Sequence, residues 1–84
     1  MQYVLNFTVE AKGDSLDCTY RFEACDDYDA REKARQYIAD QQKKHNEQCA
    51  REMENRYFWW KLLSVDRVDG VRHIEREVLT RISV

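Results

Sequence analysis

The chain has 84 residues, of which 43% are hydrophobic and 36% are charged, and its formal net charge is -2. This length provides a single domain, residues 1–84, with one modest core. The near-balanced charge excludes a strong overall attraction to nucleic acid or to anionic membranes. No apolar run approaches the roughly 18 residues of a membrane span, and we expect no signal peptide. Three cysteines without regular spacing favour free thiols, so we expect a cytoplasmic protein.

Residues 2–24 predict an antiparallel hairpin. Apolar and polar side chains alternate in residues 2–10 and again in residues 17–24, which is typical of half-buried strands. The sequence Gly13-Asp14-Ser15 between them has turn chemistry. The expected inward residues are Tyr3, Leu5, Phe7, Val9, Cys18, Tyr20, Phe22 and Ala24.

A long helix is predicted to follow, from Asp27 to about Glu54. Asp26 or Asp27 can cap its N-terminus, where the helix dipole also favours acidic side chains. Ala30, Ala34, Tyr37, Ile38 and Gln41 form its inward stripe. Such a helix would be about 42 Å long, whereas an eight-residue strand spans about 26 Å. We therefore expect its second half to overhang the sheet or to break near Asn46.

Two further strands are predicted in the C-terminal part of the chain. Residues 57–68 are rich in β-forming side chains, and the pair Leu62-Leu63 interrupts the alternation in a way that indicates a bulge. Asp69-Gly70 predicts a two-residue hairpin turn, and the remaining residues form the last strand. The expected fold class is α+β, a four-stranded antiparallel sheet in the order β-β-α-β-β with one long helix on one face.

The adjacent tryptophans Trp59 and Trp60 must point to opposite faces of a strand. We assign Trp60 to the helix side, which leaves Trp59 on the face that no helix covers. The predicted open face is a mixed aromatic, aliphatic and basic surface of the kind that usually contacts a partner. Its candidate partner-binding residues are Arg21, Tyr57, Trp59, Lys61 and Arg81, and the polar helix end adds Lys43, Lys44 and Arg51 as a second candidate surface.

No pattern in the sequence indicates catalysis or a cofactor. His45 and Cys49 are four residues apart, but a zinc site needs at least three protein ligands. The acidic residues near Asp26 are explained by helix capping, and no phosphate-binding glycine loop or metal motif is present. We therefore expect a protein that is not an enzyme and that holds no cofactor and no metal.

The segments "FEACDDYDAREKARQYI" and "YFWWKLLSVDRV" together resemble a pattern of small phage and mobile-element proteins, including some anti-CRISPR proteins. In that pattern a strand ends in an acidic cap, an alanine-spaced helix follows, and a strand runs back. The resemblance implies a non-catalytic inhibitor that binds a larger host complex in the host cytoplasm, and it transfers no functional residue.

Three hypotheses for function follow from these observations. The first is a protein-binding module, an inhibitor or adaptor that occludes a surface of a larger protein or complex. The second is a structural homodimer in which the open sheet face is buried. The third is a single-stranded nucleic-acid-binding protein whose aromatic side chains stack on bases, and no membrane partner is expected.

Overall fold

The computed structural model describes residues 1–51, 58–73 and 76–84. Its elements are β1 (Gln2–Ala11), β2 (Asp14–Glu23), α1 (Asp27–Arg51), β3 (Trp59–Val71) and β4 (Glu77–Ile82). The strands form one antiparallel sheet in the order β2-β1-β3-β4. The α+β class and the predicted β-β-α-β-β order are confirmed.

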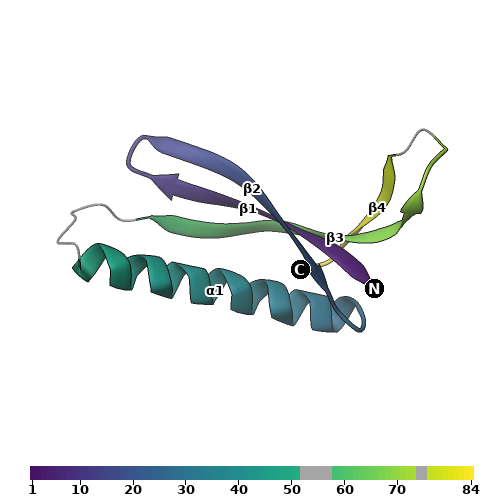
Figure 1. Ribbon diagram of the computed structural model, residues 1–84, viewed down its shortest axis with the longest axis horizontal. Helices are drawn as coiled ribbons and strands as arrows, with labels where there is room; N and C mark the ends of the chain where they lie inside the picture. Colours follow the sequence, from purple (N-terminus) through teal and green to yellow (C-terminus); the bar gives the residue numbers. More distant parts are fainter. Residues whose placement is uncertain (52–57, 74–75) are drawn as a thin grey trace.

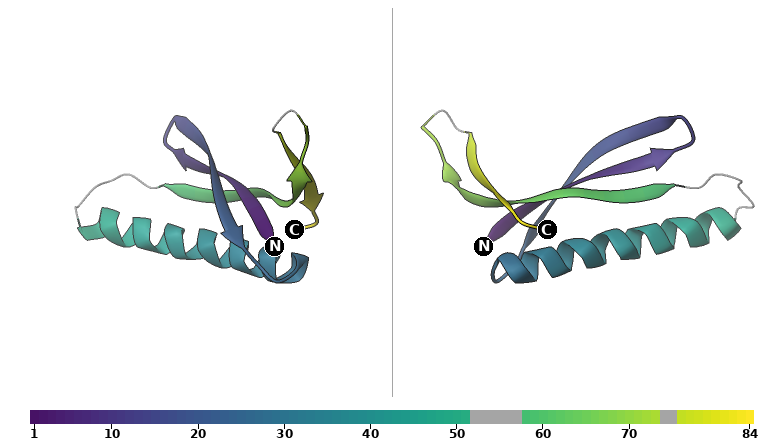
Figure 2. Two further views of the ribbon diagram at one scale, coloured as in Figure 1. Left: turned by 45° about the vertical axis from the view of Figure 1, so that its right-hand side comes forward. Right: turned by 180° about the vertical axis from the view of Figure 1, so that it is seen from behind.

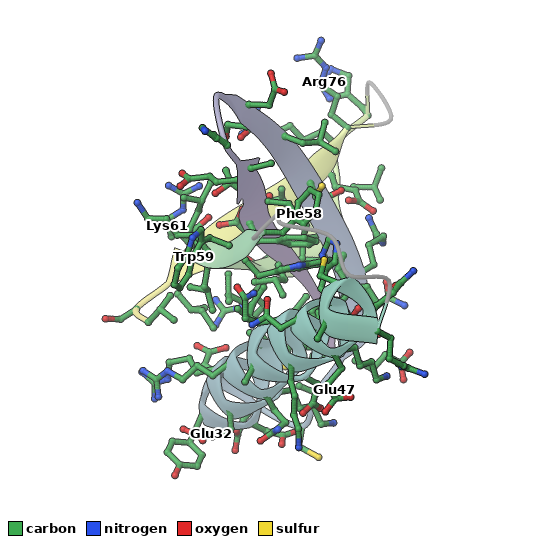
Figure 3. The ribbon with its side chains drawn as sticks, turned by 90° about the vertical axis from the view of Figure 1, so that its left-hand side faces the viewer. Glu32, Glu47, Phe58, Trp59, Lys61 and Arg76 are labelled. Atoms are coloured by element: carbon green, nitrogen blue, oxygen red, sulfur yellow. The ribbon has the colours of Figure 1, made fainter. Side chains whose placement is uncertain are left out.

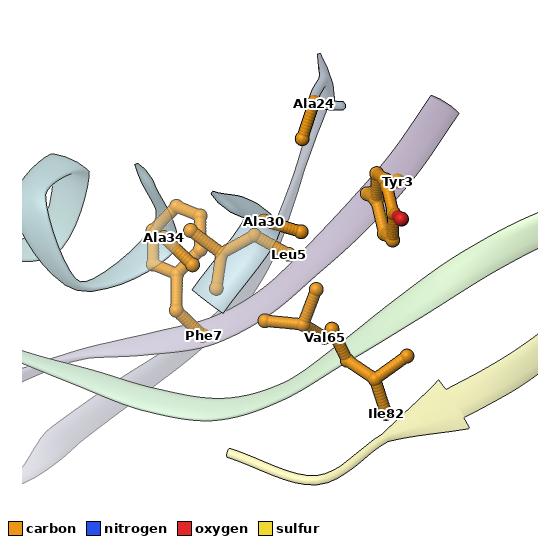
Figure 4. Packing of buried hydrophobic residues seen from close by; sticks show 8 residues of the cluster. All are labelled: Tyr3, Leu5, Phe7, Ala24, Ala30, Ala34, Val65 and Ile82. Atoms are coloured by element: carbon orange, nitrogen blue, oxygen red, sulfur yellow. The ribbon is translucent and has the colours of Figure 1, made fainter. Parts of the chain in front are cut away.

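The core lies between α1 and one face of the sheet (Figure 4). Ala30 and Ala34 are buried, and their small side chains let the helix approach the buried Leu5 and Val65 of the two central strands closely. The inward residues of β1 are therefore confirmed, and the predicted stripe of α1 is confirmed for Ala30, Ala34, Tyr37 and Ile38. The core cluster consists of Tyr3, Leu5, Phe7, Ala24, Ala30, Ala34, Val65 and Ile82.

The N-terminus of α1 is fixed by side-chain hydrogen bonds. Asp26 is the N-cap, because its Oδ1 accepts a hydrogen bond from the Asp29 N–H at 2.8 Å. Asp27 accepts hydrogen bonds from the Tyr3 hydroxyl at 2.9 Å and from Arg67 at 3.1 Å. Burial, with the neighbouring Asp27, raises the pKa of Tyr3 to about 12. These contacts attach the first turn of the helix to β1 and β3.

The helix does not break near Asn46, and at Gln42 and His45 its second half packs on β3, so only its last turns overhang the sheet. It is continuous to Arg51, and β3 has 13 residues rather than eight. At about 3.3 Å per residue such a strand spans about 43 Å, which matches the roughly 38 Å of a 25-residue helix. Figure 1 shows β3 running back along most of α1, with the last turns of the helix extending past the start of the strand.

The irregularities of β3 differ in part from the prediction. The register with β1 shifts between the pairs Asn6–Ser64 and Phe7–Leu62, so Leu63 is an extra residue and the expected bulge is confirmed. The predicted Asp69-Gly70 turn is wrong, because β3 continues to Val71 and the register with β4 shifts at this point instead. Asp69 is occupied in hydrogen bonds with Arg67 and Thr80, which stabilise a bulge rather than a turn.

The sheet is strongly curved. The β1–β2 hairpin and the β3–β4 hairpin both rise away from α1, at opposite ends of the molecule (Figures 1 and 2). Arg21 of β2 reaches Glu77 of β4 at 2.7 Å, although β1 and β3 lie between these strands in the sheet. In a flat sheet the outer strands would be about 14 Å apart. The face away from α1, called the open face below, is therefore concave.

Candidate binding surface on the open face

Trp59 and Lys61 lie together on the open face, as predicted. Trp59 is opposite Glu10 of β1 and Lys61 is opposite Thr8, so both side chains leave the same side of β3. Figure 3 shows the two side chains next to each other at the end of the sheet. Trp59 is 67% exposed, and Lys61 is exposed as well. We call Trp59, Lys61 and the neighbouring Glu10 the Trp59 surface.

Trp60 determines the direction in which Trp59 points. Its indole stacks on Phe7 of β1, with ring centroids 5.2 Å apart, on the helix side of the sheet. Its Nε1–H donates a hydrogen bond to Nδ1 of His45 at 3.1 Å. Because successive side chains of a strand alternate between faces, anchoring Trp60 on the helix side directs the indole of Trp59 into solvent.

The second half of α1 holds this end of β3 through Gln42. The Gln42 side chain donates a hydrogen bond to the Phe58 carbonyl and accepts one from the Trp60 N–H at 2.6 Å. The Phe58 ring stacks on His45, with centroids 4.1 Å apart. Since β4 pairs with β3 only from Val65 onward, the Gln42 amide takes the place of a neighbouring strand at this edge. His45, which the sequence analysis considered as a metal ligand, is part of this packing.

Arg21 and Arg81 lie on the open face, but both are already ion-paired. Arg21 donates two hydrogen bonds to the Glu77 carboxylate at 2.7 Å, and a third, at 3.2 Å, goes to Gln2. This pairing raises the pKa of Arg21 and lowers the pKa of Glu77. Arg81 pairs with Asp66 at 3.2 Å. The basic surface expected from the sequence is therefore largely neutralised within the chain.

A polar cluster at the centre of the open face was missed by the sequence reasoning. Asp66 is only 8% exposed, and it accepts hydrogen bonds from the Asn6 amide at 2.9 Å and from Arg81. The Asn6 amide also donates to the Ser64 hydroxyl at 3.0 Å. The alternation of Ser64 and Asp66 with apolar residues was the available signal. This cluster separates the Trp59 surface from the Arg21–Glu77 pair, so the predicted residues do not form one continuous patch.

The remaining predicted residues do not join the Trp59 surface. Tyr57 lies outside the described residues. Lys43, Lys44 and Arg51 are exposed on the second half of α1, on the side of the sheet away from the open face. The helix end therefore remains a separate candidate surface.

Within residues 1–51, 58–73 and 76–84, no group of three or more side chains is arranged to hold a metal ion. No described helix combines the length and the apolar character that crossing a membrane requires.

Comparison with known proteins finds no matching family, curated protein or solved structure.

Proposed function

We propose that this chain is a non-catalytic protein-binding module whose main contact is the Trp59 surface. The observation that carries the proposal is the 67% exposure of Trp59 beside a fully anchored Trp60. An exposed tryptophan costs solubility, and large aromatic side chains are the residues most often found at the energetic centre of protein interfaces.

The local chemistry indicates the kind of contact. The indole offers a flat apolar surface with one N–H donor. Within the described residues Lys61 has no ion pair, so it is available to an acidic group of a partner beside the indole. A partner surface with an apolar recess flanked by a carboxylate would match this arrangement. Occlusion of such a surface on a larger complex is the action that the resemblance to small phage inhibitors also suggests.

A nucleic-acid ligand is less well supported by the same geometry. Base stacking on Trp59 is feasible, but Arg21 and Arg81 already have the carboxylates of Glu77 and Asp66 as partners, which weakens their attraction for phosphate. Lys61 alone would give weak and strongly salt-dependent binding.

Affinity capture from a bacterial lysate tests the proposal. The wild type is compared with Trp59→Ala and Lys61→Glu, and with Tyr28→Ala as a matched control. Tyr28 is 65% exposed and lies on the first turn of α1, so its truncation removes a similarly exposed aromatic ring elsewhere. We expect the same proteins to be retained by wild type and Tyr28→Ala and to be lost with Trp59→Ala. Equal recovery with all four proteins would contradict the proposal.

A binding titration with a labelled single-stranded oligonucleotide at low salt separates the nucleic-acid alternative. The proposal predicts no binding that depends on Trp59. Binding that Trp59→Ala abolishes would assign the surface to nucleic acid instead.

A further inference from the structure

The outer edge of β2 presents unpaired backbone groups. Met1 and Ala24 exchange two backbone hydrogen bonds, from Met1 N to the Ala24 carbonyl at 3.1 Å and from Ala24 N to the Met1 carbonyl at 3.0 Å. In an antiparallel ladder, hydrogen-bonded and non-bonded pairs alternate. The residues of β2 that direct N–H and C=O away from β1 are therefore Ser15, Asp17, Thr19, Arg21 and Glu23.

One contact of α1 agrees with this assignment. The Glu23 carbonyl accepts a hydrogen bond from Lys33 Nζ at 3.1 Å, as expected for a group that points away from β1. The helix reaches the edge of β2 only near this end, because the rest of the hairpin rises away from it (Figure 2). In the part of the chain that the structure describes, no strand pairs with the outward groups from Ser15 to Arg21.

The edge of β2 lacks several of the devices that normally protect a sheet edge. Its ten residues pair with β1 in an unbroken register, without a bulge, and the strand contains neither proline nor lysine. Natural sheets normally blunt a long regular edge with such devices. The contrast with β3 is direct, because the Gln42 amide caps the edge of that strand.

The side chains of β2 are complementary to a second copy of the same strand. If two β2 strands pair antiparallel about a two-fold axis at Thr19, Asp17 of each copy lies directly opposite Arg21 of the other. Thr19 then faces Thr19. Opposite charges and paired threonines are both favourable when they are directly across from each other. Arg21 uses its two terminal nitrogens for Glu77, which leaves its Nε–H available to Asp17.

Neighbouring registers lack this complementarity. An axis at Asp17 places two aspartates face to face, and an axis at Tyr20 places Asp17 opposite Glu23. An axis at Cys18 places Asp17 opposite Thr19, which has no charge. Charge therefore favours the Thr19 axis over these three registers.

The same register covers exposed apolar side chains on the helix side of the sheet. Leu16 is 65% exposed and Tyr20 is 40% exposed in the single chain. With the axis at Thr19, Leu16 lies opposite Phe22 of the second copy and Cys18 lies opposite Tyr20. We propose that this chain forms a symmetric dimer by antiparallel β2–β2 pairing about Thr19, which makes one continuous eight-stranded sheet.

This interface does not use the Trp59 surface. Trp59 is on β3, and β1 lies between that strand and β2. The dimer would present two copies of the Trp59 surface, and it can exist whether or not the proposed function is correct.

Sedimentation velocity over a range of concentrations tests the dimer. We expect the wild type to show a monomer–dimer equilibrium. Asp17→Lys replaces two favourable pairs with two repulsive ones and should raise the dimer dissociation constant at least about tenfold. Glu47→Lys makes the same change of charge on an exposed position of α1 and should have no effect.

Thr19→Pro is a second, independent variant. The Thr19 N–H points outward, so proline removes a donor that only the second copy uses, and edge strands tolerate proline at such positions. Far-UV circular dichroism confirms that each variant is folded. A wild type that stays monomeric at the highest concentration reached would overturn the proposal. A dimer that survives both Asp17→Lys and Thr19→Pro would overturn it as well.

Disulfide trapping tests the register. In a Cys18→Ser, Cys25→Ser background, Thr19→Cys places two thiols on the two-fold axis, where paired Cα atoms lie about 5.5 Å apart. We expect a covalent dimer from Thr19→Cys and none from Ser15→Cys, whose counterpart is Glu23. A covalent dimer from Ser15→Cys alone would contradict the Thr19 axis.

Discussion

Gln42 is the residue whose removal should most directly loosen the end of β3 that carries Trp59. Its side-chain amide makes two hydrogen bonds to the backbone of this strand, with the Phe58 carbonyl and the Trp60 N–H. Each such bond contributes about 0.5–1.5 kcal/mol net. Gln42→Ala should therefore lower the free energy of unfolding by about 1–3 kcal/mol. For a domain of this size, each kcal/mol lowers the unfolding midpoint by about 4–8 °C.

The assay is chemical and thermal unfolding followed by circular dichroism, with amide hydrogen exchange of Trp60 as a local measurement. Gln36→Ala is the matched control, because Gln36 is on the same helix and, among the described residues, its side chain bonds to the exposed side chain of Asp40 and not to β3. The control should cost less than about 0.5 kcal/mol. Gln42→Glu keeps the acceptor for Trp60 but turns a carboxylate oxygen toward the Phe58 carbonyl, so it should also cost more than the Gln36→Ala control. The reasoning is refuted if Gln42→Ala costs no more than Gln36→Ala and leaves exchange at Trp60 unchanged.

Three further outcomes are expected from the core and its polar contacts. The Tyr3 hydroxyl has a pKa of about 12 in the folded protein, against 10.0 in the unfolded chain, so the unfolded state loses its proton first as pH rises. The free energy of unfolding should therefore fall between pH 10 and pH 12. Tyr3→Phe should reduce this pH dependence. Ala34→Leu should destabilise the protein by about 1–3 kcal/mol in urea unfolding, because Ala34 is buried against the sheet, whereas Ala39→Leu at an exposed position should change stability little. Asp66→Ala leaves the donors around this buried carboxylate unpaired and should cost about 1–3 kcal/mol, and a neutral result in thermal unfolding would show that water replaces it.

The sequence was sufficient to predict which segments are helices and which are strands, because the apolar residues of each segment recur at the spacing of one of these structures. The alternation in β1, which Val4 interrupts, and the small-residue spacing of Ala30 and Ala34 indicate which faces pack on each other, and the structure agrees. The doublet Leu62-Leu63 located a bulge for the same reason, since an extra residue is the simplest way to keep the alternation in phase on both sides.

The errors arose where local chemistry competes with long-range contacts. Asp69-Gly70 is a strong turn signal by itself, but hydrogen bonds to Asp69 from Arg67 and from Thr80 on the next strand hold it in β3. The length of β3 and its pairing with Gln42 depend on where the helix ends relative to the strand, which no local pattern records. For the candidate surface, alternation correctly placed Trp59, whereas the neutralisation of Arg21 depends on sheet curvature that brings Glu77 within reach.

The exposure of Trp59 is the central claim, and fluorescence of a single-tryptophan protein measures it directly. In Trp60→Phe the only indole is Trp59, and the retained ring keeps a stacking partner for Phe7. We predict emission typical of an indole in water and efficient quenching by iodide, whereas Trp59→Phe should leave a shielded indole that iodide quenches weakly. A blue-shifted, unquenched Trp59 in the isolated protein would contradict the account.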